Sequence, residues 1–251
     1  MNLKFILNIW IKIFGVVFFP DCGAYDRYQW LKKNLIPPKE NSNLLDIGCG
    51  NGWAIFLAAQ KGYKSTGFSW SEEDLKRVKE SSELLNLSVN LVVHDARQLD
   101  KFKAEKKFDV IINLENIEHI IDDQKLINDM SNLLDKNGLL YLSTPSLFYS
   151  LFVKESPIKR LKVEDGSHVV RGYTFKKLEK MLEKNNLFVV HKSYIGGPFS
   201  RSLLSFSRIF SQKIFKIFYI PLSIMFQKID HIFFKKNTNN LCIAIIAEKI
   251  D

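Results

Sequence analysis

The strongest constraint on the fold is a glycine-rich turn directly after a short apolar segment. Residues 43–47 (NLLDI) form the apolar run, and residues 48–52 (GCGNG) follow it. Glycines at alternate positions let the backbone approach a ligand closely, and a helix that starts after such a turn presents free N–H groups. The pattern predicts a strand, a ligand-binding turn and then a helix over residues 54–61.

The chain beyond this turn alternates between strand and helix patterns, which is typical of βαβ units in a parallel sheet. The expected strands are 43–47, 63–68, 89–93, 108–113, 139–143, 187–191 and 241–247. The expected helices are 54–61, 71–86, 122–134 and 174–184, with Ser71 and Thr174 as the N-caps of the second and the fourth. No internal repeat or low-complexity linker divides the chain. We therefore expect one α/β domain over residues 25–251, with insertions at 145–170 and 199–236.

Two other nucleotide ligands fit the turn poorly. A dinucleotide-binding fingerprint requires a third glycine where Trp53 stands, and an acidic residue at the end of the second strand, where this chain has Ser69. A phosphate-binding P-loop requires a Gly-Lys-Ser/Thr triplet, which the turn lacks. The turn therefore disfavours NAD and a P-loop nucleotide as its ligand.

The charge is distributed unevenly along the chain. The formal net charge is +9, yet residues 44–198 carry 22 basic and 21 acidic side chains, so the excess lies in the two ends. Both ends are also rich in Phe, Ile and Leu. Basic apolar segments favour an anionic membrane surface over nucleic acid. The three cysteines lie far apart, which disfavours a disulfide framework and fits a cytoplasmic protein.

The apolar ends are predicted to be helical but not transmembrane. The apolar run at 5–19 is interrupted by Asn8 and Lys12 and is shorter than the roughly 20 residues that span a bilayer. It lacks the cleavage site of a secretory signal, so residues 1–24 are expected to form a basic apolar helix. Apolar residues in 199–236 recur at helical spacing. This segment either packs on the domain as a hairpin or lies in a membrane interface.

Several motifs occur in a family-specific order. They are LLDIGCGNG, GFSWSEEDL, HDARQL, FDVIINLENIEHI, NGLLYLSTPS and HVVRGYTFKKLEKMLEKNNL. The chain resembles the class I S-adenosylmethionine (SAM)-dependent methyltransferases, in the type 11-like branch that modifies small molecules and lipids. The resemblance implies a seven-stranded sheet of order 3-2-1-4-5-7-6 with an antiparallel last strand. It also places SAM across the carboxyl ends of strands one, two and four.

The resemblance assigns cofactor contacts to particular residues. Asp46 matches the residue that holds the methionine end of SAM, Asp95 accepts a hydrogen bond from the adenine amine, and Asn113 lies near the sulfonium. One departure is Ser69, because most relatives place there a carboxylate that binds both ribose hydroxyls; Glu72 or Glu73 is an alternative ribose ligand. The expected SAM-binding residues are Asp46, Gly48, Cys49, Gly50, Ser69, Trp70, Asp95, Ala96 and Asn113.

Two histidines are candidates for the chemistry. His119 follows strand four at the mouth of the inferred site and is the best candidate base, since imidazole titrates near neutral pH. His168 lies in the loop after strand five, where relatives cover the acceptor. A purely structural role is the alternative for both. Glu115, Glu118 and His119 also resemble the divalent-metal motif of the ubiquinone-pathway O-methyltransferases, and carboxylates with imidazole suit such an ion.

These observations predict a SAM-dependent methyltransferase, with S-adenosylhomocysteine as product. The expected reaction is O-methylation of a small or lipid-linked hydroxyl compound by a cytoplasmic protein peripheral to a membrane. Quinone precursors, lipids and polyprenyl-linked sugars all remain open as acceptors. An RNA methyltransferase is an alternative that the nearly neutral core disfavours. A membrane-associated protein that binds SAM without catalysis is the other alternative.

Overall fold

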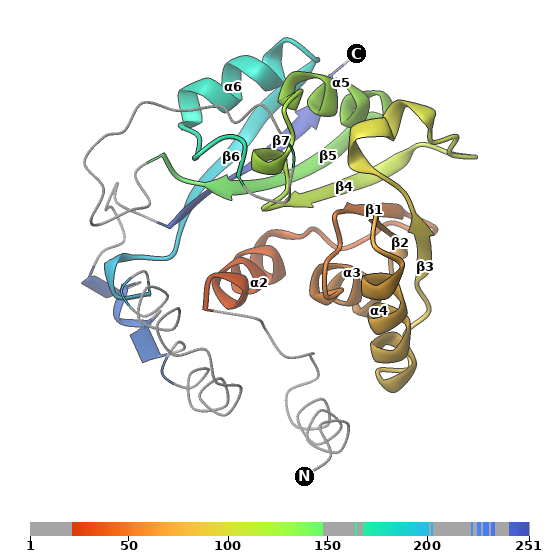
Figure 1. Cartoon of the computed structure of the whole chain (residues 1–251), viewed down its shortest axis with the longest axis horizontal. Helices are drawn as coiled ribbons and strands as arrows, with labels where there is room; N and C mark the ends of the chain where they lie inside the picture. The colour runs from red at the N-terminus through yellow and green to blue at the C-terminus, as the bar shows by residue number, and fades with distance from the viewer. Residues whose placement is uncertain are drawn as a thin grey trace.

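The computed structural model describes residues 22–147, 164, 168–200, 202, 222, 225–226, 228–230, 232–233 and 241–250. The expected N-terminal helix over 1–24 lies outside these residues except for its last three positions, which belong to another helix. Much of the two expected insertions, at 145–170 and 199–236, also lies outside them. Figure 1 shows the arrangement of the described elements.

Strands and helices alternate along the described chain as the sequence predicts. The helices are α2 (Cys22–Asn34), α3 (Trp53–Gln60), α4 (Glu72–Leu84), α5 (Asp123–Leu133) and α6 (Phe175–Glu183), with short 3-10 helices η1 (Ala96–Lys101) and η2 (Ile117–His119). The strands are β1 (Asn43–Ile47), β2 (Lys64–Ser69), β3 (Asn90–Val93), β4 (Phe108–Leu114), β5 (Leu134–Pro145), β6 (Leu187–Ile195) and β7 (Cys242–Lys249).

The sheet has the predicted order β3-β2-β1-β4-β5-β7-β6. Strand β1 pairs in parallel with β2 on one side and with β4 on the other, and β7 runs antiparallel to both of its neighbours. The chain winds outward in opposite directions from β1 and β4, so a ligand-binding crevice is expected beyond their carboxyl ends. Such switch points hold the ligand in open α/β sheets.

Helices cover both faces of the sheet. Figure 1 shows α2, α3 and α4 on one face and α5 and α6 on the other. The strand pattern explains this arrangement, because successive side chains point to opposite faces. Along β4, Val110 and Ile112 enter the core under α2 and α3, while Ile111 enters the core under α5. Both faces of the central strands are therefore apolar, as in a doubly covered parallel sheet.

Side-chain caps fix the starts of three helices. Ser71, Asp122 and Thr174 each accept a hydrogen bond from a backbone N–H three residues later, at 3.2, 2.9 and 3.2 Å. The predicted caps Ser71 and Thr174 are thus confirmed, and such caps stabilise a helix by about 1 kcal/mol. The largest differences from the prediction are helix α2, which was not expected over its residues, and longer strands β5 and β6.

Asp230 joins the two ends of the C-terminal insertion. Its buried carboxylate accepts hydrogen bonds from the backbone N–H groups of Phe199, at 3.0 Å, and Ser200, at 2.8 Å. The rings of Phe199 and Phe226 lie 5.8 Å apart. The described positions between 222 and 233 are helical, as the apolar spacing predicts. Within the described part of the chain, no helix is long and apolar enough to cross a membrane.

Candidate active site

The glycine turn lies at the carboxyl end of β1 and opens into the crevice. Gly48, Gly50 and Gly52 all have positive φ values, of 76°, 51° and 84°. The backbone N–H groups of Gly48 and Cys49 donate to the carbonyl of Phe68 at 3.0 and 2.9 Å, which ties the turn to β2. A Cβ atom at Gly50 would meet no atom closer than 3.9 Å. The turn therefore leaves open space next to its exposed backbone.

Asp46 is a buried carboxylate at this turn. Only 3% of it is exposed, and no described residue donates a hydrogen bond to its Oδ2 atom. Burial raises the pKa of Asp46 to about 7, and the backbone N–H of Ile55 only partly offsets this effect. A buried carboxylate is costly unless a ligand or a protein group satisfies it. A carboxylate held in this state is suited to bind a donor group that enters the crevice.

Two amide side chains lie at the same edge of the sheet. Asn113 is fully buried in β4; its Nδ2 donates weakly to the Ile47 carbonyl at 3.4 Å, while no described residue donates to its Oδ1. Asn116 has no described acceptor for its Nδ2, and its side chain lies close enough to Gly48 that a Cβ there would approach to 3.0 Å. Buried polar atoms nearly always have partners, so three unsatisfied ones around one turn indicate a ligand site.

The ends of β2 and β3 bring the other predicted cofactor residues to this edge. Ser69 pairs with Val93 in the parallel register, so Trp70 and Asp95 follow neighbouring strand ends. Trp70 is 77% exposed and offers an uncovered aromatic face. The Ser69 hydroxyl accepts from the Ser71 N–H at 3.1 Å, so its own O–H remains a donor. Ala96 starts η1 next to Asp95.

The remaining predicted residue of the turn, Cys49, is buried at 6% exposure. Burial raises the pKa of the Cys49 thiol, and the nearby negative charge of Asp46 raises it further, so the thiol stays neutral. A Cβ atom at Gly67 of β2 would lie 3.2 Å from the Cys49 Sγ. Cys49 thus packs the turn against β2, and its role in SAM binding stays a prediction.

Glu118, His119 and His168 come together beyond the carboxyl end of β4. Each offers one ligand atom, and these atoms all lie within 4.8 Å of one another. The rings of His119 and His168 meet edge to face with their centroids 4.7 Å apart. The Val170 N–H donates to the Glu118 carbonyl at 3.0 Å, which holds the segment after β5 against η2. The structure thus unites the two predicted catalytic histidines, which lie 49 positions apart in sequence.

Glu118 is the most buried member of this cluster. Its Oε2 accepts from the Thr144 hydroxyl at 3.1 Å, whereas Oε1 has no described hydrogen-bond partner and lies 3.9 Å from His119 Nε2. Burial raises the pKa of Glu118 well above its usual range, and the negative charge of Glu115 adds to this effect. Burial therefore favours the protonated form of this carboxyl group until a cation faces it.

Glu115 points to a different set of partners. Its Oε1 accepts from the Ser143 hydroxyl at 3.1 Å, and its Oε2 lies 3.7 Å from Arg27 Nη1 of helix α2. The residue has a φ of 54°, a left-handed conformation that only a few per cent of non-glycine residues adopt. The metal set predicted from sequence, Glu115 with Glu118 and His119, is therefore not gathered; His168 takes the third place.

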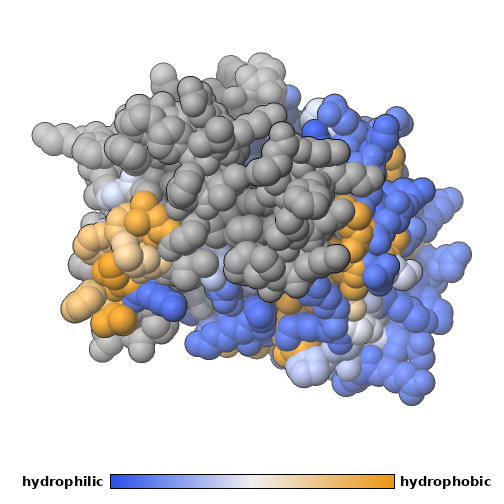
Figure 2. Space-filling model, turned by 90° about the horizontal axis from the view of Figure 1, so that it is seen from below, coloured by the Kyte–Doolittle hydropathy of each residue, from blue (hydrophilic) through white to orange (hydrophobic). Residues whose placement is uncertain are grey.

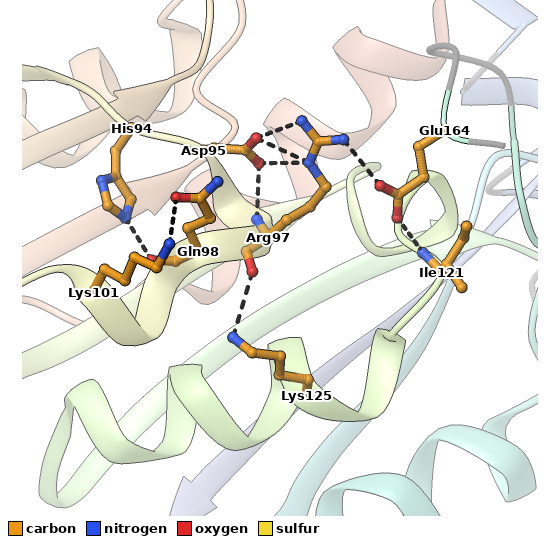
Figure 3. A network of polar contacts seen from close by, with 8 residues as sticks. All are labelled: His94, Asp95, Arg97, Gln98, Lys101, Ile121, Lys125 and Glu164. Atoms are coloured by element: carbon orange, nitrogen blue, oxygen red, sulfur yellow. Dashed lines mark hydrogen bonds and ion pairs between the residues drawn. The ribbon is translucent and has the colours of Figure 1, made fainter.

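Helix α2 and a pair of charged residues complete the surroundings of the site. Tyr28 of α2 is buried with its ring 6.1 Å from that of Trp53, next to the turn. Arg97 and Glu164 hold Asp95 through a network that Figure 3 shows. Arg97 stands two residues after a predicted ligand, which is the only sequence signal for it.

Comparisons with known proteins agree with this geometry. Residues 24–192 match the family model described as a methyltransferase domain. The ubiquinone biosynthesis O-methyltransferase of Pelagibacter ubique is 32% identical over 127 residues, which cover 47% of this chain and 52% of that protein. That of Coxiella burnetii is 31% identical over 105 residues, covering 42% and 44%. The chain spans about half the length of the curated relatives it matches.

Solved structures show the same fold. A SAM-dependent methyltransferase from Clostridium acetobutylicum superposes with a TM-score of 0.56 at 17% identity, covering 99% of this chain and 98% of that one. The N-methyltransferase NodS from Bradyrhizobium japonicum, solved with S-adenosyl-L-homocysteine, gives 0.59 at 14% identity, covering 92% and 90%. With the sheet order and the family match, these findings show that the chain belongs to the class I SAM-dependent methyltransferases.

Proposed function

We propose that this protein transfers the methyl group of SAM to a hydroxyl group of a small or lipid-linked acceptor. The observation that carries the proposal is the cluster of Glu118, His119 and His168 beside the glycine turn. An alcohol or phenol must lose its proton when it is methylated, whereas this family's cofactor already carries an activated methyl group. The two imidazoles and the buried carboxyl of this cluster are groups that can accept that proton.

The residues of the crevice fit SAM. SAM supplies a methyl group on a positively charged sulfur when it is bound. Asp46 offers a carboxylate oxygen that has no described donor, and the open backbone at Gly50 leaves room for the ligand chain. Trp70 offers an exposed ring at the end of β2, and Asp95 offers an ionised acceptor at the end of β3. Aromatic faces and carboxylate acceptors are suited to a purine base.

The histidines would manage the acceptor proton. His119 is only partly exposed and lies next to Glu118, so it is the better placed of the two imidazoles to accept a proton from a hydroxyl inside the crevice. His168 is exposed and packs edge to face on His119, so it would orient that ring and cover the acceptor. Glu118 Oε1 lies 3.9 Å from His119 Nε2, so an ionised Glu118 would stabilise the imidazole after it accepts the proton.

A divalent ion is a second way to activate the same hydroxyl. Glu118, His119 and His168 would hold it, since one carboxylate and two imidazoles suit a hard or borderline ion. The ion would lower the pKa of a bound hydroxyl, and it would also keep Glu118 ionised. Chelation with EDTA distinguishes the two mechanisms, because activity lost on chelation and restored by Mg²⁺ or Zn²⁺ requires the ion.

The proposed acceptor is presented at an anionic membrane surface. Residues 199–240 carry seven basic side chains and one acidic side chain, Asp230, which is buried and bonded to the backbone of the same segment. Leu222, Met225, Ile232 and Phe233 expose apolar surface there, with Ile232 and Phe233 at 69% and 72%. Figure 2 shows hydrophobic side chains gathered at the edge of the molecule where these helical residues lie. Exposed apolar side chains on a segment with a net positive charge suit an anionic bilayer.

Vesicle sedimentation tests the membrane contact. The double variant Ile232→Ser/Phe233→Ser removes exposed apolar surface that would enter the bilayer. Burying apolar surface stabilises binding by roughly 25 cal/mol per Å², so binding to phosphatidylglycerol vesicles should weaken by about ten-fold or more. Val190→Ser is the matched control, because Val190 is 57% exposed on β6, away from this segment. Equal binding of all three proteins would contradict the membrane contact while leaving the methyltransferase proposal intact.

Acceptor assays test the reaction itself. Wild-type protein would be incubated with SAM labelled in the methyl group and with a polyprenylated phenol, a polyprenyl-linked sugar, or RNA. We expect label in a hydroxyl compound and none in RNA, because the core carries almost no net charge. Labelled RNA would favour the alternative nucleic-acid acceptor. Tight binding of S-adenosylhomocysteine without transfer to any acceptor would favour a non-catalytic SAM-binding protein.

A further inference from the structure

Arg97 holds both carboxylate oxygens of Asp95 in place. Its backbone N–H donates to Oδ1 at 2.9 Å, its Nε lies 2.9 Å from both oxygens, and its Nη2 donates to Oδ2 at 2.5 Å. Figure 3 shows the carboxylate facing the guanidinium. Three N–H groups make these contacts, and the Nε–H is shared between both oxygens. The Asp95 side chain is still 25% exposed, so its carboxylate stays accessible to a further donor that enters the crevice.

Glu164 holds the other side of Arg97. Its Oε2 accepts from Arg97 Nη1 at 3.0 Å, and its Oε1 accepts from the Ile121 N–H at 2.6 Å. The Glu164 side chain is only 19% exposed, although that of Arg97 is 51% exposed. Glu164 thus joins the loop after β3, which carries Asp95, to the loop after η2, which carries Ile121 (Figure 3).

The same segment reaches the acid–base cluster. Glu164 precedes His168 by four positions, and the His168 ring packs against His119 with centroids 4.7 Å apart. Four residues span at most about 14 Å, so the two contacts cannot move far from each other. A short piece of chain after β5 therefore contacts the proposed adenine-binding loop at one end and the proposed base at the other.

We propose that Arg97 and Glu164 are positioning residues: they aim the Asp95 carboxylate at the exocyclic amine of the cofactor and link its recognition to the placement of His168. The inference rests on the proposed binding of SAM in this crevice. A carboxylate fixed by a fork of N–H groups discriminates between a donor and an acceptor on the purine, because it cannot turn away from a wrong group. Without Arg97 or Glu164, the carboxylate can turn and discrimination falls.

Calorimetric binding of two nucleosides measures this discrimination. S-adenosylhomocysteine has an amine where S-inosylhomocysteine has a carbonyl oxygen, which Asp95 would repel. We expect wild-type protein to prefer the adenosine compound by about 10- to 100-fold, the range for a hydrogen bond to a charged group. Glu164→Gln should reduce that preference by about three- to ten-fold, and Arg97→Gln by at least as much, through weaker binding of the adenosine compound.

The controls separate positioning from loss of structure. Glu179→Gln removes a carboxylate of helix α6 that forms an ion pair with Lys192 of β6 at 2.6 Å. This variant should leave the preference for the adenosine compound unchanged. Arg97→Lys keeps the charge but loses the fork, so its preference should lie between those of wild type and Arg97→Gln. Unchanged affinity for S-inosylhomocysteine in Glu164→Gln shows that the crevice is still folded.

The link to His168 has its own measurement. The imidazole signals of His168, assigned with a His168→Gln variant, should shift in the NMR spectrum when S-adenosylhomocysteine binds to wild type, and shift less in Glu164→Gln. An unchanged preference in both Glu164→Gln and Arg97→Gln would overturn the positioning role, and equal shifts of His168 would overturn the link. If wild type binds neither nucleoside, the proposed function fails first and this inference falls with it.

Discussion

Replacing Asp46 with Asn should make the ligand-free protein less sensitive to pH while destroying cofactor binding. Asp46 is buried, and its pKa is raised to about 7 from 3.8. The folded state therefore keeps a proton that the unfolded state releases between these two values. Its stability falls as the pH rises through this window, because folding then opposes ionisation.

The magnitude follows from the raised pKa. One unit corresponds to 1.36 kcal/mol, so a carboxyl with a pKa near 7 when folded and near 3.8 when unfolded costs about 2–3 kcal/mol more at pH 8 than at pH 5. The amide of Asn does not titrate, so its own burial cost is the same at both pH values. From pH 5 to pH 8, the unfolding free energy of wild type should therefore fall by about 2–3 kcal/mol relative to that of Asp46→Asn.

Urea unfolding of both proteins at pH 5 and pH 8 measures this shift, and calorimetry with S-adenosylhomocysteine measures binding at pH 7.5. Asp46→Asn should lose at least about ten-fold in affinity, since a charge-assisted hydrogen bond is replaced by a neutral one. Asp109→Asn is the matched control, because Asp109 lies on the neighbouring strand β4, where its carboxylate accepts a hydrogen bond from the Asn43 N–H at 2.8 Å. A pH-independent stability difference, or retained binding in Asp46→Asn, would refute the assigned role.

Four further substitutions should have separable effects. Gly50→Ala should weaken S-adenosylhomocysteine binding with a stability loss of only about 1 kcal/mol, whereas Gly52→Ala should destabilise the fold further, because its Cβ would meet Phe56 at 2.7 Å and Val78 at 2.9 Å; thermal melts with and without ligand distinguish them. His119→Ala should lower kcat by about 10²- to 10⁴-fold with little change in cofactor affinity, and an unchanged kcat in stopped-time assays would exclude it as the base. Trp70→Ala should change the melting temperature little, because the side chain is 77% exposed, but should weaken nucleoside binding by about 1–2 kcal/mol; equal affinities would remove Trp70 from the site.

Local sequence patterns predicted the core of the fold well. The strand and helix patterns and the caps Ser71 and Thr174 depend on neighbours only a few residues away, and all of them are present in the structure. The order of the seven strands came from the family resemblance, and it too is confirmed. Helix α2 was missed because its apolar and polar residues show no clear helical stripe. Its burial depends on α3 and on β5, where Trp30 packs against Tyr141.

The residues of the site also divide into those that the sequence predicted and those that only the tertiary structure brings together. The sequence by itself determined the glycine turn, Asp46 and the strand-end positions of Ser69 and Asp95, because a turn after a parallel strand must open at the carboxyl edge of the sheet. Which side chains meet across loops was decided only by tertiary structure. The metal-binding set expected from the sequence contained Glu115, but in the structure His168 lies beside Glu118 and His119. Glu115 contacts Ser143 and Arg27 instead.

The Asp95–Arg97–Glu164 network is the clearest case of what tertiary structure adds. Arg97 and Glu164 lie 67 positions apart, so no local pattern relates them. They meet because Glu164, which follows β5 in the chain, lies beside the residues that follow β3 and η2, where it also accepts a hydrogen bond from the Ile121 N–H at 2.6 Å. Sequence periodicity encodes which face of an element is apolar, whereas ion pairs between distant loops depend on how the whole chain closes.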